Sequence, residues 1–286
     1  MTTPTPRTDA IATAFVAGHP IGHSRSPVIH RHWLDEHGLQ GAYETRDVAP
    51  NALEMWLEAL DPRDGPGGNV TVPHKEAVRR WLGSRVDEAA REIGAVNTLW
   101  FESGALWGGN TDAYGFAANL DHHAPAWEQA DHALVIGAGG AARAVVHALK
   151  TAGIRRIEVA NRTLARAESL VEEFGLARAW TLEDVATPLR DADLVVNTAS
   201  LGMVGAASAE TSSYGDPSNF NPNAIATDIV YAPLDTPFLQ TARMAGCRTV
   251  DGLGMLLHQA APGFERWFGV RPQVTPALRR AVERTL

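Results

Sequence analysis

The stretch at residues 134–142 reads LVIGAGGAA. Its first three residues are apolar and predict a short buried strand, and the glycines that follow fit the pattern G-x-G-x-x-G/A in front of a helix. Glycines in this position let backbone N–H groups approach a pyrophosphate at the amino end of the helix. The pattern takes its specificity from lying between a strand and a helix. It therefore predicts a dinucleotide-binding fold.

Helices and strands alternate after this loop. The predicted helices are residues 141–152 and 164–174, and the predicted strands are residues 157–160, 194–197 and 226–229. Such alternation indicates a doubly wound, Rossmann-like parallel sheet. Residues 204–223 are rich in Ser, Asn, Pro and Gly, which predicts a surface loop.

The residues before the loop predict a different α/β unit. Strands are predicted at 14–18, 42–48 and 69–72, and a hairpin at 95–101 and 105–108. Helices are predicted from 26 or 27 to 34 and at 51–60, 75–82 and 87–93, and a last helix at 253–268. Strands and helices that alternate and end in a hairpin indicate a mixed α/β sheet. The fold class is therefore α/β with two domains, one mixed-sheet and one Rossmann-like, and with a cleft between them.

Composition narrows the possible functions. The 286 residues suffice for two domains, and 45% hydrophobic with 20% charged residues is ordinary for a soluble enzyme. The net charge of −8 argues against nucleic acid as a partner. Cys247 is the single cysteine, so no intramolecular disulfide can form, and its apolar neighbours predict a core thiol. No apolar run approaches the ~20 residues of a membrane span. Residues 1–9 resemble a frayed tail and not a signal peptide, so we expect a cytoplasmic protein.

Two segments carry polar groups that do not fit a core. Residues 20–27 read PIGHSRSP and place Ser24 and Ser26 close to a glycine. Residues 68–75 read GNVTVPHK. This short apolar run also contains an Asn and a Thr, and it is followed, behind a proline, by Lys75. Two hydroxyls beside a turn together with a lysine suggest a site for a small, polyhydroxylated, anionic substrate.

The end of the strand at 157–160 predicts the cofactor. An NAD enzyme usually has Asp or Glu about 20 residues after the glycine loop, where it binds a ribose 2′-hydroxyl. Here the strand is followed by Asn161, Arg162 and Thr163, with Arg166 one turn further. Two guanidinium groups suit a 2′-phosphate, which they can bind in bidentate fashion. The alternative is that both arginines are solvated surface residues.

The two polar segments match the N-terminal signatures of the shikimate dehydrogenase family. The likeness continues through Asn97-Thr98, GNTD at 109–112, the loop at Gly137 and DGLGM at 251–255, in the order of the family. It extends from residue 14 to residue 270. The chain therefore resembles shikimate dehydrogenases over most of its length. The resemblance implies a substrate-binding, catalytic domain at 1–111 and 252–286 and an NADP-binding domain at 112–251.

The resemblance also implies the acid–base pair. In the family the residues matching Lys75 and Asp112 face each other across the substrate, so we expect these two to be catalytic. Lysine is a charged proton donor at neutral pH, as the reduction of a ketone requires. A structural alternative is that Asp112 is the N-cap of a helix that begins at Ala113.

The remaining site residues follow from the same resemblance. Ser24 and Ser26 are expected to bind the substrate carboxylate; the alternative is that they are only a helix N-cap and its neighbour. Thr71, Asn97 and Gln259 are expected to bind ring hydroxyls. Tyr231 would reach the substrate from the cofactor domain, or else it is an aromatic residue that packs in a turn. The residues expected to hold NADP are Gly137, Ala138, Gly139, Gly140, Ala141, Asn161, Arg162, Thr163, Arg166, Gly252 and Met255.

Four histidines near the amino terminus raise the question of a metal. These residues are His19, His23, His30 and His32. They lack a Cys, Asp or Glu partner at a familiar ligand spacing, so no metal site is predicted. Arg31 departs from the family, which commonly has Asn after the residue matching His30.

The expected activity is the reversible, NADP-dependent reduction of 3-dehydroshikimate to shikimate, a step of aromatic amino-acid biosynthesis. A quinate or dual quinate/shikimate dehydrogenase is the nearest alternative. A second alternative is a catalytically silent regulatory module on the same fold. The presence of both Lys75 and Asp112 argues against it. A glutamyl-tRNA reductase-like enzyme would need a nucleophilic cysteine, and Cys247 lies too far along the chain. The expected partners are the small substrate and cofactor, with no nucleic acid and no membrane, in a monomer or homodimer.

Overall fold

The computed structural model describes residues 12–199 and 216–286, which form two compact units. Unit 1 comprises Met1–Ala90, Ala95–Gly109 and Ala260–Thr285, and unit 2 comprises Arg91–Gly94, Asn110–Gln259 and Leu286. The chain passes into unit 2 at 109–110, two residues before the predicted domain boundary. The chain returns to unit 1 at 259–260, in the middle of the helix Leu253–Phe268. The predicted boundary, at 251–252, lies before this helix.

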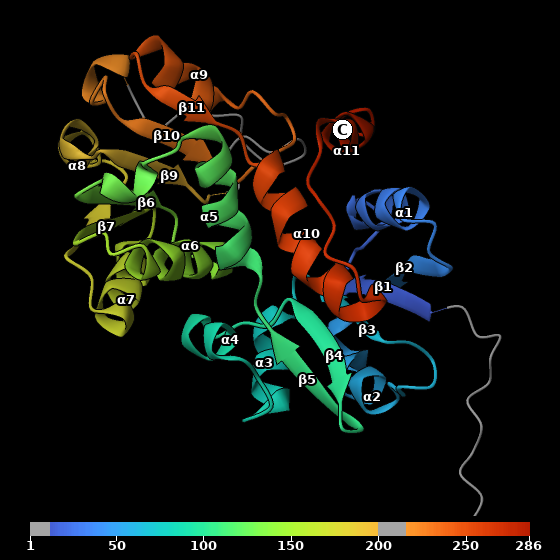
Figure 1. Ribbon diagram of the computed structural model, residues 1–286. Coiled ribbons are helices and arrows are strands. Elements are labelled where there is room, and N and C mark those ends of the chain that lie inside the picture. The colour runs from blue at the N-terminus through green and yellow to red at the C-terminus, as the bar shows by residue number, and fades with distance from the viewer. Residues whose placement is uncertain (1–11, 200–215) are drawn as a thin grey trace, which may run out of the picture. The chain divides into compact units, whose positions relative to one another are not determined.

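Unit 1 is built on a mixed five-stranded sheet with the order β2-β1-β3-β4-β5 (Figure 1). Its strands are β1 (Ala12–Gly18), β2 (Gly41–Asp47), β3 (Gly67–Val70), β4 (Thr98–Glu102) and β5 (Ala105–Gly109). The first three are parallel, and β4 is antiparallel to both β3 and β5. Ser103 and Gly104 have φ of 51° and 80° between β4 and β5, as in the tight turn of a hairpin. The predicted mixed sheet and hairpin are thus confirmed, although β4 begins three residues after the predicted start.

The core of unit 1 lies on both faces of β1. Phe15 and Ala17 belong to one apolar cluster, and Ala14 and Val16 belong to another. Successive side chains of a strand point to opposite faces, so a continuous apolar run marks a strand covered on both sides. The helices that begin in this part of the chain are α1 (Ser26–Glu36), α2 (Leu53–Glu58), α3 (Lys75–Leu82), α4 (Glu88–Ile93) and α11 (Pro276–Glu283), with a 3-10 turn, η1 (Pro50–Ala52), before α2.

Unit 2 has the predicted doubly wound fold. Its six parallel strands have the order β11-β10-β9-β6-β7-β8, the strand order of a Rossmann domain. They are β6 (His132–Ile136), β7 (Arg156–Asn161), β8 (Arg178–Thr181), β9 (Leu194–Asn197), β10 (Ile225–Asp228) and β11 (Arg248–Val250). The α-helices are α5 (Asp112–His123), α6 (Gly140–Thr151), α7 (Leu164–Phe174), α8 (Ala186–Asp191) and α9 (Pro237–Met244), and α10 (Leu253–Phe268) begins in unit 2 and ends in unit 1. The 3-10 turns are η2 (Trp127–Gln129) and η3 (Pro217–Asn219).

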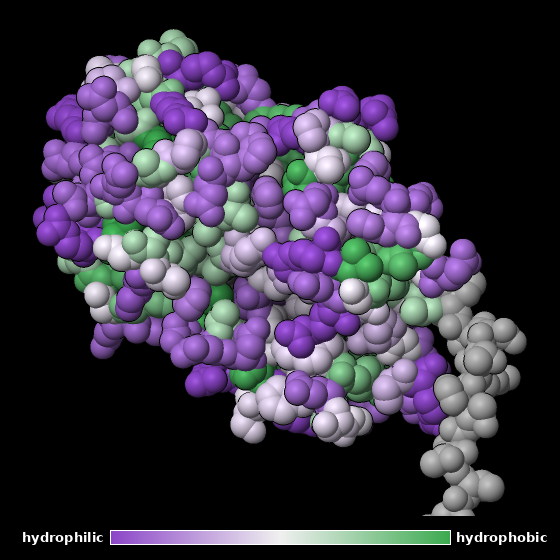
Figure 2. Space-filling view, viewed as in Figure 1, coloured by the Kyte–Doolittle hydropathy of each residue, from purple (hydrophilic) through white to green (hydrophobic). Residues whose placement is uncertain are grey.

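Cys247 lies buried next to β11, and its Sγ is 3.3 Å from the carbonyl oxygen of Asn221. Burial raises the pKa of the Cys247 thiol, which agrees with the predicted core thiol. The predicted tail at 1–9 and most of the predicted loop, residues 204–215, lie outside the described residues. None of the helices in the described ranges is long and apolar enough to cross a membrane. Figure 2 shows hydrophilic side chains over much of the viewed surface.

His30 is buried on the aromatic side of the unit 1 core. Its ring stacks on Tyr43 with centroids 3.9 Å apart, and Trp33, Phe264 and Trp267 surround it. Within residues 12–199 and 216–286, neither ring nitrogen has a partner at hydrogen-bond geometry. Desolvation lowers the pKa of His30 from 6.5 to about 3, and the nearby Asn69 amide opposes this shift only in part.

This burial predicts a loss of stability in acid. Between pH 6.5 and about 3 the unfolded chain binds a proton at His30 that the folded chain does not. Above pH 6.5 the neutral His30 therefore costs no stability. Below pH 6.5, each unit by which the pH falls lowers the free energy of unfolding by about 1.4 kcal/mol because of this group. We expect the urea midpoint of the wild type to drop more between pH 7.5 and pH 5 than that of His30→Leu. Parallel pH profiles in the two proteins would contradict this expectation.

Candidate substrate and cofactor sites

The carboxyl ends of β1 and β3 bring two predicted substrate segments together in unit 1. The N–H of Thr71 donates to the carbonyl of Ala17 at 2.8 Å, and the N–H of His19 donates to that of Val72 at 3.1 Å. These bonds hold the loop after β1 beside the residues that follow β3. β3 ends at Val70, two residues earlier than predicted, and Val72 is 70% exposed. Val72 and Pro73 thus lie at the surface, whereas His74, just before Lys75, is buried.

Ser24 and Ser26 lie at the start of α1. The Ser24 hydroxyl accepts the N–H of Ser26 at 3.3 Å, but α1 has no side-chain cap hydrogen bond, so the capping alternative is wrong for Ser24. The N-cap position itself belongs to Arg25. Ser26 is the first residue of the helix and is buried. Burial raises the pKa of the Tyr43 phenol, and the nearby Ser26 hydroxyl opposes this shift in part.

Lys75 is the first residue of α3, and its backbone contacts Val96, the residue before Asn97. The imidazole of His74 is buried and 2.6 Å from the carbonyl oxygen of Val48, which fixes the turn in front of the helix. The carbonyl of Lys75 accepts the N–H of Val96 at 2.9 Å. The residues Ser26, Thr71, Lys75 and Asn97 therefore all lie at one edge of the unit 1 sheet.

Asp112 begins α5 in unit 2 and is 9% exposed. The N-cap position belongs to Thr111, and the N–H of Asp112 donates to Oδ1 of Asn110 at 2.9 Å. The alternative that Asp112 is the N-cap is therefore wrong, because the Asn110 amide turns the chain one residue earlier. A carboxylate in the first turn of a helix is stabilised by the helix dipole.

The helices α5 and α10 approach each other closely at Gly115. A Cβ at this position would lie 2.6 Å from Cβ of Gln259 and from the carbonyl oxygen of Met255. The Thr111 hydroxyl is 3.4 Å from Oε1 of Gln259. Two of the predicted ligand-binding residues, Gln259 and Met255, thus lie on the part of α10 that faces the start of α5.

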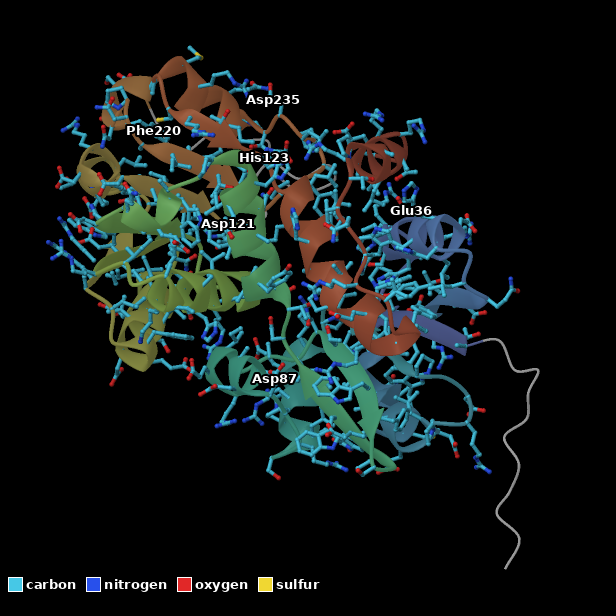
Figure 3. All side chains as sticks on the ribbon, viewed as in Figure 1. Glu36, Asp87, Asp121, His123, Phe220 and Asp235 are labelled. Carbon is cyan, nitrogen blue, oxygen red and sulfur yellow. The ribbon has the colours of Figure 1, made fainter. Side chains whose placement is uncertain are left out.

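The other end of α5 is also fixed. Asp121, labelled in Figure 3, accepts the indole N–H of Trp127 at 2.7 Å. The carbonyl of His123, labelled in the same view, accepts a hydrogen bond from the guanidinium of Arg248. A helix held at both ends places Asp112 in one position relative to the Rossmann sheet.

The glycine loop lies at the carboxyl end of β6. Gly137 has φ of 109°, and a Cβ there would lie 2.4 Å from Oγ1 of Thr198, so only glycine fits. Gly139 is the N-cap of α6 and, like Gly140, is exposed. No described atom outside the neighbouring backbone lies within 4 Å of a Cβ built on Gly139 or Gly140. This open helix amino terminus fits the pyrophosphate of a dinucleotide.

The carboxyl end of β7, the strand beside β6, carries the two arginines. The amide of Asn161 donates to the carbonyl of Thr163 at 2.9 Å and shapes the turn before α7. Arg162 and Arg166 are exposed, and within the described part of the chain neither forms an ion pair with a carboxylate. Two accessible guanidinium groups without an acidic residue in the turn fit a 2′-phosphate and not a bare ribose hydroxyl.

A buried carboxylate shapes the turn that carries Tyr231. Asp228 ends β10 and accepts hydrogen bonds from the N–H of Val230 at 2.9 Å and from the hydroxyl of Thr236 at 2.7 Å. Burial raises the pKa of Asp228, and the bonds from Thr236 and Asn197 counteract part of this shift. A Cβ on Gly252 would lie 2.5 Å from the carbonyl of Ile229, so the loop after β11 packs directly on this turn. Sequence reasoning missed the role of Asp228, for which a polar residue at the end of an apolar strand is the signal.

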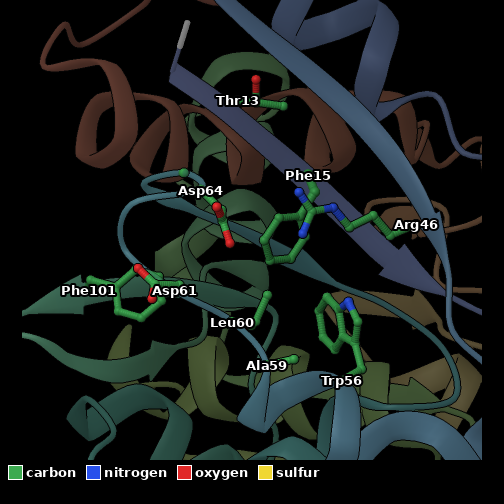
Figure 4. Close-up of a pocket in the computed structure, with 10 residues that line it drawn as sticks. Thr13, Phe15, Arg46, Trp56, Ala59, Leu60, Asp61, Asp64 and Phe101 are labelled. Carbon is green, nitrogen blue, oxygen red and sulfur yellow. The ribbon is translucent and has the colours of Figure 1, made fainter. Parts of the chain in front are cut away.

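A pocket of about 180 Å³ opens elsewhere in unit 1 (Figure 4). Phe15, Arg46, Trp56 and Asp64 are among the residues that line it. The guanidinium of Arg46 lies 4.4 Å from the centroid of the Phe15 ring. The lining residues Thr13 and Gly65 place the pocket toward the amino ends of β1 and β3, away from the predicted substrate residues.

Together, the Rossmann sheet, the glycine loop and the paired arginines define a protein of the dinucleotide-dependent dehydrogenase class. Three family models match the chain: the shikimate dehydrogenase substrate binding domain at residues 16–99, shikimate / quinate 5-dehydrogenase at 122–216, and the shikimate 5'-dehydrogenase C-terminal domain at 252–283. The chain belongs to the shikimate dehydrogenase family.

Individual relatives resemble the chain over nearly its whole length. A shikimate dehydrogenase (NADP(+)) of Chelativorans sp. is 55% identical, with 96% of each chain covered. The structure of shikimate 5-dehydrogenase from Thermus thermophilus in complex with NADP(H) and shikimate has a TM-score of 0.84 at 40% identity, covering 96% of this chain and 100% of that one. Quinate dehydrogenase from Corynebacterium glutamicum in complex with NAD has a TM-score of 0.84 at 30% identity, covering 95% and 98%.

The position of Ser26 leads to a prediction about substrate affinity. Replacing Ser26 by Ala removes a hydroxyl donor at the predicted carboxylate site. We expect KM for shikimate to rise by about tenfold or more, the worth of one hydrogen bond to a charged group, while KM for NADP stays unchanged. Steady-state kinetics measure both constants. Unchanged kinetics in Ser24→Ala, Ser26→Ala and the double variant would show that these serines only shape the start of α1.

Proposed function

We propose that this protein catalyses the reversible, NADP-dependent reduction of 3-dehydroshikimate to shikimate. The observation that carries the proposal is the 55% identity, over 96% of the chain, to a shikimate dehydrogenase (NADP(+)). The exposed Arg162 and Arg166 after β7 support NADP as the cofactor, because they are suited to its 2′-phosphate.

The substrate residues divide between the two units of the chain. In unit 1, Ser24 and Ser26 bind the carboxylate, and Thr71 and Asn97 bind ring hydroxyls. Unit 2 contributes Gln259 on α10 and Tyr231 in the turn after β10. The positions at strand ends and helix starts support these roles, since polar groups there are held by the sheet and remain accessible.

The cofactor would be held by the loop from Gly137 to Ala141, by the residues from Asn161 to Thr163 with Arg166, and by Gly252 and Met255. Bound NADPH supplies the hydride of the reduction. The chain itself must supply a proton at the carbonyl oxygen of the substrate. Lys75, a half-buried ammonium at the start of α3, donates this proton in the direction of reduction and takes it back in the reverse direction. Asp112, an anion in the first turn of α5, is the second member of the proposed acid–base pair.

The domain roles follow the same division. We propose substrate binding and catalysis for residues 1–111 and 252–286 and NADP binding for residues 112–251. We further infer a cytoplasmic monomer or homodimer whose ligands are small molecules. The acidic net charge of −8 argues against nucleic acid among them.

Quinate is the second candidate substrate. A quinate dehydrogenase with NAD bound has the same fold, and one matching family model names both activities. The arginines after β7 favour the NADP enzyme over a strictly NAD-dependent one.

The proposal is tested by the absorbance of reduced nicotinamide. Purified protein mixed with shikimate and NADP should form NADPH, and the reverse reaction should consume it with 3-dehydroshikimate. Protein that binds NADP but reduces none of it with shikimate would contradict the proposal and favour the silent regulatory module.

A further inference from the structure

The pocket near the amino ends of β1 and β3 borders an apolar cluster of unit 1. Phe15 belongs to the buried part of this cluster, and Trp56, Leu60 and Phe101 are partly buried residues packed against it. All four also line the pocket. The rings of Phe15 and Trp56 meet edge to face, with centroids 5.3 Å apart. The pocket therefore offers a ligand a mainly aromatic surface, as binding sites for small molecules do.

One wall of the pocket carries a cation. Arg46 lies on the edge strand β2 and is paired with Ala17 of β1, which belongs to the same apolar cluster as Phe15. Its guanidinium lies 4.4 Å from the centroid of the Phe15 ring, and this contact holds the planar group in the pocket. Within residues 12–199 and 216–286, no carboxylate forms an ion pair with Arg46. A half-buried guanidinium held in this way is suited to bidentate binding of a carboxylate.

Two carboxylates, those of Asp61 and Asp64, also line the pocket. Asp61 is engaged by Arg63, which donates to it through Nε at 2.8 Å and Nη2 at 2.5 Å. Asp64 attracts Arg63 only as a nearby charge, and it forms no ion pair with any residue that the structure describes. Figure 4 shows the side chains of Asp64 and Arg46 approaching the Phe15 ring from opposite sides. One pocket thus holds a cation and an anion that are not paired with each other.

The volume of the pocket limits the size of the ligand. Its 180 Å³ is slightly more than the roughly 150 Å³ of an engineered cavity that binds benzene. It is less than the roughly 300–1,000 Å³ of pockets that hold drug-sized ligands and cofactors. One aromatic ring with a small polar head group fits this space, whereas a dinucleotide does not.

We propose that this pocket binds an amino acid whose side chain has a single aromatic ring. Its carboxylate lies on Arg46, its ammonium on Asp64 and its ring against Trp56 and Phe101. An ammonium and a carboxylate on one carbon match the unpaired anion and cation of the pocket. A simple carboxylate would be repelled by the two aspartates, and a simple amine by Arg46.

The proposed amino-acid site is separate from the substrate residues. It lies toward the amino ends of β1 and β3, whereas the substrate segments follow the carboxyl ends of the same strands. The inference therefore goes beyond the proposed dehydrogenase activity and stands or falls without it.

The test uses L-phenylalanine as the probe and the side-chain N–H signal of Trp56 in the ¹⁵N spectrum as the readout. The signal is assigned by its absence in Trp56→Phe. We expect a saturable shift with L-phenylalanine. The Kd should be about tenfold or more higher for 2-phenylethylamine, which lacks the carboxylate, and for 3-phenylpropionate, which lacks the ammonium. L-Alanine, which lacks the ring, should bind more weakly as well. No shift with L-phenylalanine, or equal Kd values for all four compounds, would overturn the proposal.

A variant locates the carboxylate of the ligand. Arg46→Met keeps a long apolar stem and removes the charge, so the Kd for L-phenylalanine should rise about tenfold or more. The Kd for 2-phenylethylamine should not rise, because this compound has no carboxylate to lose. Arg31→Met removes the same charge from an exposed position on α1, outside the pocket, and should bind L-phenylalanine as the wild type does. An unchanged Kd for L-phenylalanine in Arg46→Met would contradict the proposal. If Arg46→Met does not fold, the comparison of the four compounds on the wild type decides.

Discussion

Replacing Lys75 by Met is expected to lower kcat for shikimate oxidation by roughly 10²–10⁴, the usual contribution of a positioned proton transfer. Methionine keeps a long apolar stem and removes only the charge and the proton. If Lys75 acts in the transition state, kcat falls while KM changes little. If it only binds a hydroxyl in the ground state, KM rises and kcat is preserved. Steady-state kinetics in both directions distinguish the two cases.

The chain offers a matched control for this variant. Lys150 is the other lysine of the sequence. It is not one of the proposed substrate residues, and its ammonium donates to the carbonyl of Phe174. Lys150→Met should keep kcat, whereas Asp112→Asn should lower it as Lys75→Met does. NADP binding should survive in all three proteins. A kcat near the wild-type value in Lys75→Met would refute the assignment and direct attention to Tyr231 or a bound water as the proton donor.

Replacing Arg162 by Ala is expected to raise the Kd for NADP by about ten- to more than a hundredfold. The lost bond to a phosphate is charge-assisted, and such a bond contributes roughly 1.5–3 kcal/mol. NAD lacks the 2′-phosphate, so its Kd should barely change. Isothermal titration calorimetry with each cofactor measures the two Kd values.

The cofactor prediction has its own controls. Arg166→Ala should act in the same direction as Arg162→Ala, because both guanidinium groups follow β7. Arg155 precedes β7 and pairs with Asp131, so Arg155→Ala should bind both cofactors as the wild type does. An equal loss of NADP and NAD affinity in Arg162→Ala would mean that the residue supports the fold of the turn and not the 2′-phosphate.

Helices and strands with a clear apolar period were predicted well from the sequence. The bounds of α3, α7, α10 and β9 agree with the predicted ranges to the residue. Short elements at the edges were missed. Strand β8 has only four residues, none of them fully buried, and α8 contains Pro188, so neither shows a period that distinguishes it from a loop. Helices α9 and α11 begin at a proline after a threonine cap, a signal that sequence reasoning overlooked.

The sequence indicates candidate site residues only where they follow one another along the chain. The glycine loop, the arginines after β7 and the segment before Lys75 can each be recognised from a short stretch of sequence. The contact of Tyr43 with Asn69 joins residues 26 positions apart and exists only through the sheet register. The bond by which Asn110 accepts the N–H of Asp112 depends on a turn geometry that the residue types alone leave open.

The most direct test of the account is one matrix of specificity constants, for shikimate and quinate each with NADP and with NAD. Wild-type kcat/KM should be highest for shikimate with NADP, and exchanging NADP for NAD should lower it by at least the roughly tenfold worth of one charge-assisted bond. Exchanging shikimate for quinate should lower it as well. A matrix in which quinate with NAD is the best pair would contradict both the substrate and the cofactor assigned here.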